Sequence, residues 1–415
     1  MDFSEYQPKK LVWQRPEHLL QPEHLAVVLS AARRSENRFF SQAFAHLDPS
    51  SDLRVTQVQH EPLQGGVSGA HLEQVRVQYE ASSARHPPAV MAFSLILKRV
   101  PPRASWLMRA SGDTLCREVQ LWCSDVLDDL PPALLTPALA ASYDVQTGEG
   151  ALLMADIGRW LGRFEDCFLP VSPGQQMLTL DHLARLHAHY WNDVRLSNMF
   201  LGLASPHRAL LLLSPESIAV QRATGDTHPY LAAAQSGWEA FFKHALPEPA
   251  RRIQRVLNAP DRFLASAAAM PATLVHGDVW PPNMGLWPGE RGTRGQREGN
   301  KTLLIDWALA AAGPASYDLF WLLFYWRKVD TRRALLTYRQ RLTKHLARRG
   351  IRLSAAEWSM LVDLGVVRTV LTCGETMGQA IILATNDASR ARAIALLHQW
   401  TSWADRVIAR RGWDQ

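Results

Sequence analysis

The sequence predicts an α+β protein, with a β-rich N-terminal part followed by a larger, mainly helical C-terminal part. Short segments with the two-residue alternation of strands follow one another between Arg54 and Arg99. From Gln175 onward the apolar residues recur instead at the spacing of helices, as far as the last stretch of the chain. At 415 residues the chain is also too long for one core of ordinary size.

Composition argues against several classes of protein. No run approaches the roughly 18 apolar residues that cross a bilayer, and the first residues lack the order of a signal peptide, so we expect a cytoplasmic protein without a membrane partner. Four cysteines without a Cys-x-x-Cys pair indicate buried apolar residues rather than disulfides or zinc ligands. The net charge of +6 is spread along the chain rather than clustered, which disfavours a nucleic-acid partner.

A glycine turn separates the first two of three expected strands, which cover residues 55–63, 72–79 and 90–100. Glycines let a backbone turn closely over phosphates and donate N–H groups to them, so Gly65, Gly66 and Ser68 are candidates for a nucleotide lid. An ordinary hairpin turn explains the same residues. Before these strands, residues 1–50 contain two amphipathic stretches that read as helices.

A lysine closes the third strand. Lys98 is followed by Glu118 in an amphipathic segment, residues 113–122, that we expect to be helical. A strand lysine held by a helix glutamate is the arrangement that orients a lysine onto nucleotide phosphates. The alternatives are a solvated strand end, or a phosphate contact through Arg99, which points to the opposite face of the strand.

An acid, an amide and a second acid follow two apolar runs in the C-terminal half. Asp278 and Asn283 lie in Leu274-Val-His-Gly-Asp-Val-Trp-Pro-Pro-Asn283, and Asp306 ends the next Leu/Ile-rich strand. We expect strand pairing to bring the three side chains together, beside a glycine-rich loop at 287–301. Oxygen ligands on a hairpin suit Mg²⁺, so the layout predicts a metal-assisted phosphoryl-transfer site. The alternative is a surface hairpin whose acids cap turns.

The pattern His276-x-Asp278-x-x-x-x-Asn283, followed by Ile305-Asp306-Trp307, resembles the aminoglycoside phosphotransferase and choline-kinase-like enzymes, the small-molecule branch of the protein-kinase-like superfamily. The ordered motifs cover about residues 55–325. The resemblance implies a protein-kinase-like fold with an N-terminal lobe over residues 1–154, a hinge at 155–158 and a helical C-terminal lobe over 159–415.

The resemblance also implies the catalytic roles. Asp278 positions and deprotonates the acceptor hydroxyl, while Asn283 and Asp306 hold Mg²⁺. Lys98, oriented by Glu118, contacts the phosphates of ATP. The protein-kinase features are incomplete, because Ile-Asp-Trp replaces Asp-Phe-Gly and a glycine stands where protein kinases have an arginine, so a small-molecule acceptor is favoured.

Further residues are implied to bind the base or to support the loop. The carbonyl of Ala155 and the N–H of Ile157 meet the adenine edge, and Met154 lines the base pocket. His276 supports the catalytic loop and Asp318 tethers it, with a helix cap as the alternative for Asp318.

We therefore predict a Mg²⁺-dependent kinase that transfers the γ-phosphoryl group of ATP directly to a hydroxyl of a small metabolite or antibiotic-like acceptor. Trp280 and Glu375 are candidate acceptor contacts, although Glu375 also fits a solvated acid at a helix end. An aromatic wall that contains an acid favours a cationic or polyhydroxylated acceptor over an acidic one. A catalytically silent nucleotide-binding regulatory protein of the same fold is the alternative function.

Overall fold

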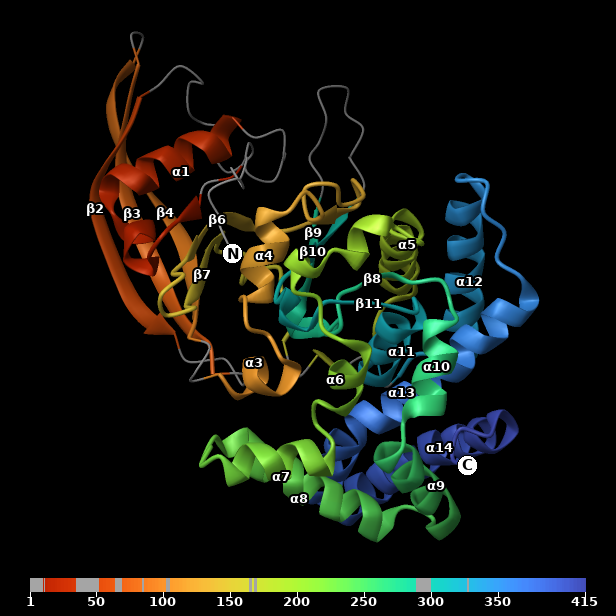
Figure 1. The fold of residues 1–415 in the computed structure, drawn as a ribbon. Helices are drawn as coiled ribbons and strands as arrows, with labels where there is room; N and C mark the ends of the chain where they lie inside the picture. The colour runs from red at the N-terminus through yellow and green to blue at the C-terminus, as the bar shows by residue number, and fades with distance from the viewer. Residues whose placement is uncertain are drawn as a thin grey trace.

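The computed structural model describes residues 10, 12–34, 52–63, 69–83, 86–101, 105–163, 166–167, 170–288, 300–326 and 328–415. A β-sheet with one covering helix forms one lobe, and a larger group of helices forms the other (Figure 1). The predicted α+β fold, with a β-rich N-terminal lobe and a mainly helical C-terminal lobe, is confirmed. The division at residues 155–158 stays a prediction.

Six strands form the sheet of the smaller lobe, in the order β1-β6-β7-β4-β3-β2. They are β1 (Val12–Trp13), β2 (Asp52–Leu63), β3 (His71–Ser83), β4 (His86–Val100), β6 (Ala138–Tyr143) and β7 (Gly150–Ala155). All neighbouring pairs are antiparallel except β1 with β6. Strands β2, β3 and β4 are the three expected from the sequence. Strand β6 was not expected, because the sequence ALAASY lacks the β-branched residues that mark strands.

The two faces of the sheet pack against different cores. One face packs on α1 (Pro22–Arg34), which follows the short 3-10 helix η2 (Pro16–Leu20) and crosses the sheet in Figure 1. In β7, Leu153 points to this side, whereas Leu152 and Met154 belong to the core of the helical lobe. Because successive side chains of a strand point to opposite faces, β7 contributes residues to the cores of both lobes.

This alternation directs Lys98 toward the helical lobe. Lys98 of β4 pairs with Leu152 of β7, and paired residues share a face of the sheet. Arg99 points the other way and forms ion pairs with Glu17 at 2.6 Å and Glu149 at 3.0 Å. Arg99, the alternative phosphate ligand, is therefore engaged on the far face.

Two short helices connect the sheet to the helical lobe, α3 (Trp106–Ser111) and α4 (Arg117–Cys123). The sequence predicted that the helix containing Glu118 begins at Asp113, and this predicted start is wrong. The carboxylate of Asp113 accepts hydrogen bonds from the N–H groups of Leu115 and Arg117, at 3.2 Å and 3.0 Å, so Asp113 precedes the helix as a turn residue. Glu118 then lies in the first turn of α4.

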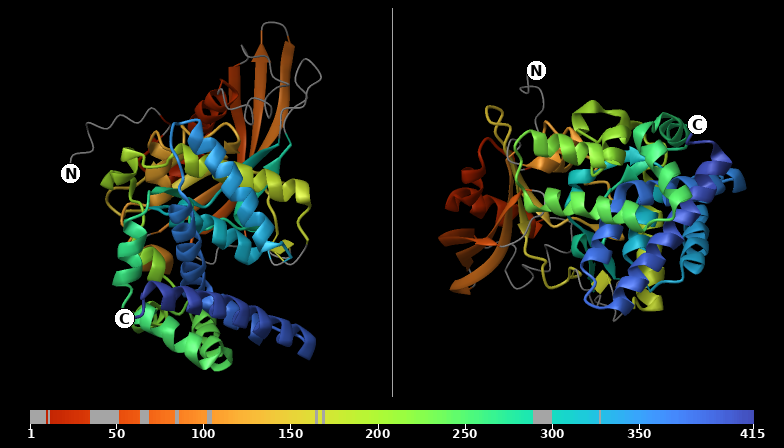
Figure 2. Two further views of the ribbon diagram at one scale, coloured as in Figure 1. Left: turned by 90° about the vertical axis from the view of Figure 1, so that its right-hand side faces the viewer. Right: turned by 90° about the horizontal axis from the view of Figure 1, so that it is seen from below.

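The helical lobe is built from long helices around two small sheets (Figure 2). The helices are α5 (Pro173–His189), α6 (Pro206–Leu211), α7 (Pro215–Ala223), α8 (Pro229–His244), α9 (Pro247–Asn258), α10 (Asp261–Ala268), α11 (Ser316–Tyr325), α12 (Thr331–Ala347), α13 (Ala355–Ile382) and α14 (Asp387–Arg411). One sheet pairs β10 (Lys301–Leu304) with β5 (Leu134–Leu135) and β9 (Met284–Trp287), and the other pairs β8 (Thr273–Val275) with β11 (Ala311–Gly313).

Helices α8 and α13 cross with their backbones in contact. A Cβ atom at Gly378 would lie 1.7 Å from the carbonyl oxygen of Gly237, and one at Gly237 would lie 2.3 Å from that of Glu375. Only glycine fits at such a crossing. The crossing fixes α13, which carries Glu375, against α8.

None of the described helices is both long and apolar enough to cross a bilayer. The four cysteines are free thiols; Cys116, Cys167 and Cys373 are buried, and Cys123 is partly buried.

Candidate active site

The loop after β8 is held from beneath by Asp318 of α11. One carboxylate oxygen accepts the N–H of His276 and the other that of Gly277, each at 2.8 Å. Gly277 has a φ of +85°, and a Cβ atom there would lie 2.3 Å from the carbonyl oxygen of Leu309. The glycine in His-Gly-Asp is therefore required by both conformation and space.

Asp318 also links this loop to two other helices. Nε2 of His187 in α5 lies 3.2 Å from Asp318, and Nδ1 of His187 lies 2.6 Å from the hydroxyl of Tyr338 in α12. Asp318 is fully buried, which raises its pKa, but hydrogen bonds from His187 and Gly277 reverse this effect and keep the pKa low. Asp318 bonds to the loop instead of capping α11.

His276 braces the loop against the strand that precedes Asp306. Its Nε2 donates to the carbonyl of Ile305 at 2.9 Å, and its Nδ1 accepts the N–H of Asp278 at 3.3 Å. The ring is fully buried, and this burial lowers its pKa. A neutral imidazole with both nitrogens occupied supports the loop geometry.

The hairpin of β9 and β10 brings the second acid alongside the amide. Asn283 ends the 3-10 helix η6 (Pro281–Asn283), and its carbonyl accepts the N–H of Ile305 at 3.1 Å. Its side-chain Nδ2 donates to a carboxylate oxygen of Asp278 at 2.7 Å. The structure therefore brings Asp278, Asn283 and Asp306 together.

Lys98 forms ion pairs with two carboxylates. Its Nζ lies 2.5 Å from Glu118 and 2.9 Å from Asp306. Burial lowers the pKa of Lys98, but the charges of Asp306 and Glu118 outweigh burial and raise it. Glu118 also accepts the N–H of Trp307 at 3.1 Å, so α4, β4 and the segment after β10 meet at one point.

Asp278 and Asp306 are close enough to affect each other. Burial and the charge of Asp306 together raise the pKa of Asp278 to about 8, although the hydrogen bond from Asn283 acts against both. Asp306 has a left-handed backbone, with a φ of 64°, and its side chain is 34% exposed. The raised pKa of Asp278 reflects the cost of placing a second negative charge beside Asp306.

The donor set fits Mg²⁺. Carboxylate and amide oxygens are its usual protein ligands, and Asn283 uses its Nδ2 on Asp278, so its Oδ1 can serve a cation. A cation would also relieve the repulsion between Asp278 and Asp306. Within the described residues, no three His, Cys, Asp or Glu side chains form a cation site. A bound Mg²⁺ would therefore need oxygens from substrate or water as well, which is its usual behaviour.

A small pocket lies between α4, β7 and the segment after β10. Its walls include Glu118, Leu152, Met154, Ile305 and Trp307. Met154 thus lines the same pocket as Glu118 and Asp306, the two carboxylates that pair with Lys98.

The backbone N–H groups at the end of β7 and just after it differ in their partners. The N–H of Ala155 donates to the carbonyl of Pro137 at 3.0 Å, and the N–H of Asp156 to that of Ser94 at 3.2 Å. Among the described residues, no acceptor is found for the N–H of Ile157. The predicted lid residues Gly65, Gly66 and Ser68 lie outside the described residues.

Two tyrosines, Tyr230 and Tyr325, lie near Glu375. Glu375 is 4% exposed in the middle of α13, so the alternative of a solvated helix-end acid is wrong. The hydroxyl of Tyr230 donates to it at 3.3 Å, and burial raises its pKa to about 7. Trp280 packs on Tyr325, with ring centroids 5.1 Å apart.

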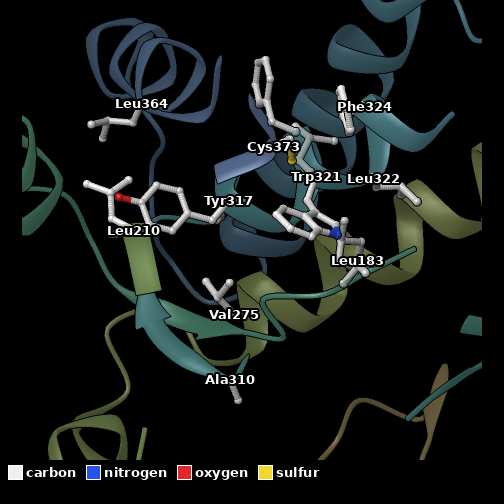
Figure 3. Packing of buried hydrophobic residues seen from close by; sticks show 14 of the residues in the cluster. Leu183, Leu210, Val275, Ala310, Tyr317, Trp321, Leu322, Phe324, Leu364 and Cys373 are labelled. Carbon is white, nitrogen blue, oxygen red and sulfur yellow. The ribbon is translucent and has the colours of Figure 1, made fainter. Parts of the chain in front are cut away.

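The sequence reasoning missed Tyr230, Trp321 and Tyr325. Tyr317, Trp321 and Tyr325 recur every four residues along α11, a spacing that places three aromatic rings on one helix face. Figure 3 shows Tyr317 and Trp321 within the core of the helical lobe. That spacing was a usable signal in the sequence.

Comparison with known proteins finds a family likeness over part of the chain. Residues 153–353, just under half of the chain, match the model of the phosphotransferase enzyme family, APH. A search of curated proteins gave no match.

Several solved structures align with this chain over most of its length. Choline kinase from Cryptosporidium parvum Iowa II has 10% identity and a TM-score of 0.42, covering 94% of each chain. Choline kinase LicA from Streptococcus pneumoniae has 13% identity and a TM-score of 0.38, covering 87% of this chain and 98% of its own. The streptomycin–ATP–APH(2")-IIa complex has 13% identity and a TM-score of 0.36, covering 89% of this chain and 99% of its own.

The matched segment includes only part of the site. Asp278, Asn283 and Asp306 lie within residues 153–353, whereas Lys98 and Glu375 lie outside that range. Lys98 and Glu375 are linked to the site by their contacts, with Asp306 and with Tyr230 respectively.

Proposed function

We propose that this protein is a small-molecule kinase that transfers the γ-phosphoryl group of ATP to an acceptor hydroxyl with the help of Mg²⁺. The observation that carries the proposal is the pair of contacts from Lys98 to Glu118 and Asp306, at 2.5 Å and 2.9 Å. These contacts hold the charged amine of Lys98 next to the accessible carboxylate of Asp306. Phosphoryl transfer needs both groups at one point, because the amine can bind the phosphates and the carboxylate can bind the metal.

Asp278 is the proposed catalytic base. The acceptor oxygen forms a bond to the γ-phosphorus as the bond from that phosphorus to the bridging oxygen of ADP breaks, and Asp278 takes the hydroxyl proton. Lys98 stabilises the charge on the phosphates. Asn283 and Asp306 would hold Mg²⁺, which neutralises further phosphate charge when bound.

The proposed nucleotide contacts lie on the Lys98 side. Met154 would line the base pocket, with the carbonyl of Ala155 and the unused N–H of Ile157 at the edge of the base. Gly65, Gly66 and Ser68 are proposed to cover the phosphates. The acceptor would lie on the opposite side of Asp278, near Trp280 and Glu375.

Isothermal titration calorimetry with Mg²⁺-ATP tests the nucleotide site. We expect wild type to bind Mg²⁺-ATP, and Asp306→Ala to bind it at least about tenfold more weakly because one metal ligand and one Lys98 contact are lost. Asp387→Ala, which changes an exposed acid in the first turn of α14, is the matched control. Equal affinity in wild type and Asp306→Ala contradicts the metal assignment.

A screen of hydroxylated metabolites then tests the chemistry. ATP consumption should coincide with a phosphorylated acceptor, detected by mass spectrometry. Binding of Mg²⁺-ATP without any phosphorylated product would support the silent regulatory alternative instead.

A further inference from the structure

The acceptor side of the site contains a buried arginine that the proposed reaction does not use. Arg368 of α13 is 5% exposed, and its Nη1 is buried without a hydrogen-bond partner among the described residues. Its guanidinium carbon lies 4.4 Å above the ring of Tyr317. A ring face stabilises a cation only in part, and burial of an unpaired charge is costly. An anion is the natural partner for such a group.

The indole of Trp321 connects Arg368 with the catalytic carboxyl. Its ring lies 5.9 Å from the guanidinium carbon of Arg368. Its indole N–H interacts with the carboxyl of Asp278 and acts to lower the pKa of that group. Burial lowers the pKa of Arg368, and the carboxyls of Asp318 and Asp278 act against this effect. Arg368 and Asp278 are therefore close enough to interact electrostatically.

Arg368 lies apart from the proposed phosphate ligands. Lys98 is paired with Glu118 and Asp306, on the side of Asp278 that faces the sheet. Arg368 belongs to α13 and packs on α11, within the helical lobe. Its position favours an anion on the acceptor over an anion on the nucleotide.

One face of α13 carries charges of opposite sign. Arg368, Thr372 and Glu375 follow one another at the four- and three-residue steps that align side chains on a helix. The rise of about 1.5 Å per residue places the two charged positions roughly 10 Å apart along the axis. Tyr230 and Tyr325, which flank Glu375, keep part of their surfaces accessible.

We propose that the acceptor is an amphoteric hydroxy compound, whose carboxylate binds Arg368 while its amine lies toward Glu375 and its hydroxyl meets Asp278. This proposal rests on the kinase function above and names its acceptor class. A planar guanidinium binds a carboxylate through two parallel hydrogen bonds, which sets orientation as well as affinity. The sequence favoured a cationic or polyhydroxylated acceptor over an acidic one. Arg368, which that expectation did not include, adds a carboxylate to the proposed acceptor.

The stability of the ligand-free protein is the first test. If the role of Arg368 is to bind a ligand, its charge is unpaired in the ligand-free protein. Arg368→Met then removes an unpaired buried charge, and Tm should stay the same or rise. Arg339→Met is the matched control, because Arg339 also stacks on an aromatic ring, Trp358 at 5.7 Å, but lies in α12. Lower Tm values for both Arg368→Met and Arg368→Gln would show a structural role and overturn the proposal.

Substrate pairs that differ in one charged group are the second test. The probes are ω-hydroxy-α-amino acids of increasing chain length, the amino alcohols that lack only the carboxylate, and the hydroxy acids that lack only the amine. We expect Arg368→Met to lower kcat/KM for the amino acids by about 10- to 100-fold more than it lowers kcat/KM for the amino alcohols. Arg368→Lys should recover part of the loss, and Arg339→Met should match wild type.

The outcomes separate this proposal from the kinase function. Phosphorylation of amino alcohols but of no carboxylate-bearing probe overturns the amphoteric acceptor and leaves the kinase function standing. Thermal stabilisation of wild type by the amino acids, lost in Arg368→Met and without any phosphoryl transfer, leaves the carboxylate site standing and overturns the kinase function. Stabilisation through Arg368 by inorganic phosphate alone, or by no probe, overturns the carboxylate site.

Discussion

Asp278 and Lys98 lie in the same site, but their surroundings fit them for different tasks. The carboxyl of Asp278 receives one hydrogen bond from Asn283 and faces the acceptor side. The amine of Lys98 is enclosed between Glu118 and Asp306, and only 6% of the residue is exposed. The first arrangement suits proton transfer, and the second suits charge neutralisation.

Substitution of these two residues should therefore have separable effects. We expect Asp278→Ala to keep its affinity for Mg²⁺-ATP and to lose about 10² to 10⁴ in kcat, the usual value of a positioned base. Lys98→Met should weaken nucleotide binding and also slow turnover. Calorimetry and steady-state kinetics on the same preparations measure both effects. Small, equal losses in the two variants would place neither residue at the reacting centre.

His182 gives the protein a stability that depends on pH. It is 4% exposed in α5, its Nδ1 lies 2.9 Å from the hydroxyl of Thr302, and burial lowers its pKa to about 4. The unfolded chain, with an ordinary pKa near 6.5, binds the proton more readily. Stability is therefore fully present above about pH 6.5 and is lost as the pH falls toward 4.

Replacement of this histidine should remove part of that dependence. Between pH 7 and pH 5 we expect wild type to lose about 1–2 kcal/mol through His182 alone, and His182→Gln to lose correspondingly less. Urea unfolding at the two pH values measures the difference. An unchanged pH dependence in His182→Gln would show that another group is responsible.

Among the helices and strands, those with a regular hydrophobic pattern could be predicted from the sequence, whereas single contacts between distant residues could not. The alternation in β2, β3 and β4 reflects one buried and one exposed face, so it is visible in the sequence. The alanine-rich β6 carries no such mark. The order of Asp278, Asn283 and Asp306 predicted their meeting, because a hairpin pairs residues that are close in sequence. Arg368 could not be predicted, because a buried arginine and a solvated one look alike in a sequence.

The crossing of α8 and α13 is an element-scale constraint with a direct test. Gly237→Ala would place a methyl group against the carbonyl of Glu375, so the helices must separate. We expect a loss of about 1–3 kcal/mol in the free energy of unfolding. Gly174→Ala in α5 is the control, because a Cβ atom there meets nothing within 4 Å. Equal effects of the two changes on unfolding would mean that the crossing tolerates a side chain.

For the whole molecule, the site lies where two separately packed cores meet. Strand β7 contributes one face to each core, and Lys98 reaches from the sheet to Asp306 of the helical lobe at 2.9 Å. The lobes are thus joined at the site by charged groups. A bound nucleotide would contact both lobes and should raise Tm by mass action.

The paired hydrogen bonds to Asp318 have a consequence for amide hydrogen exchange. The N–H groups of His276 and Gly277 are bound by a fully buried carboxylate, which His187 also holds, so they can exchange with solvent only when the packing of α5 and α11 opens. We expect both amides to exchange as slowly as the helical core, although they lie in a loop. Asp318→Asn, which exchanges one acceptor oxygen for a donor group, should release at least one of them about tenfold faster, measured by NMR against amides of α9. Fast exchange of both amides in wild type would show that the loop moves independently of the helices beneath it.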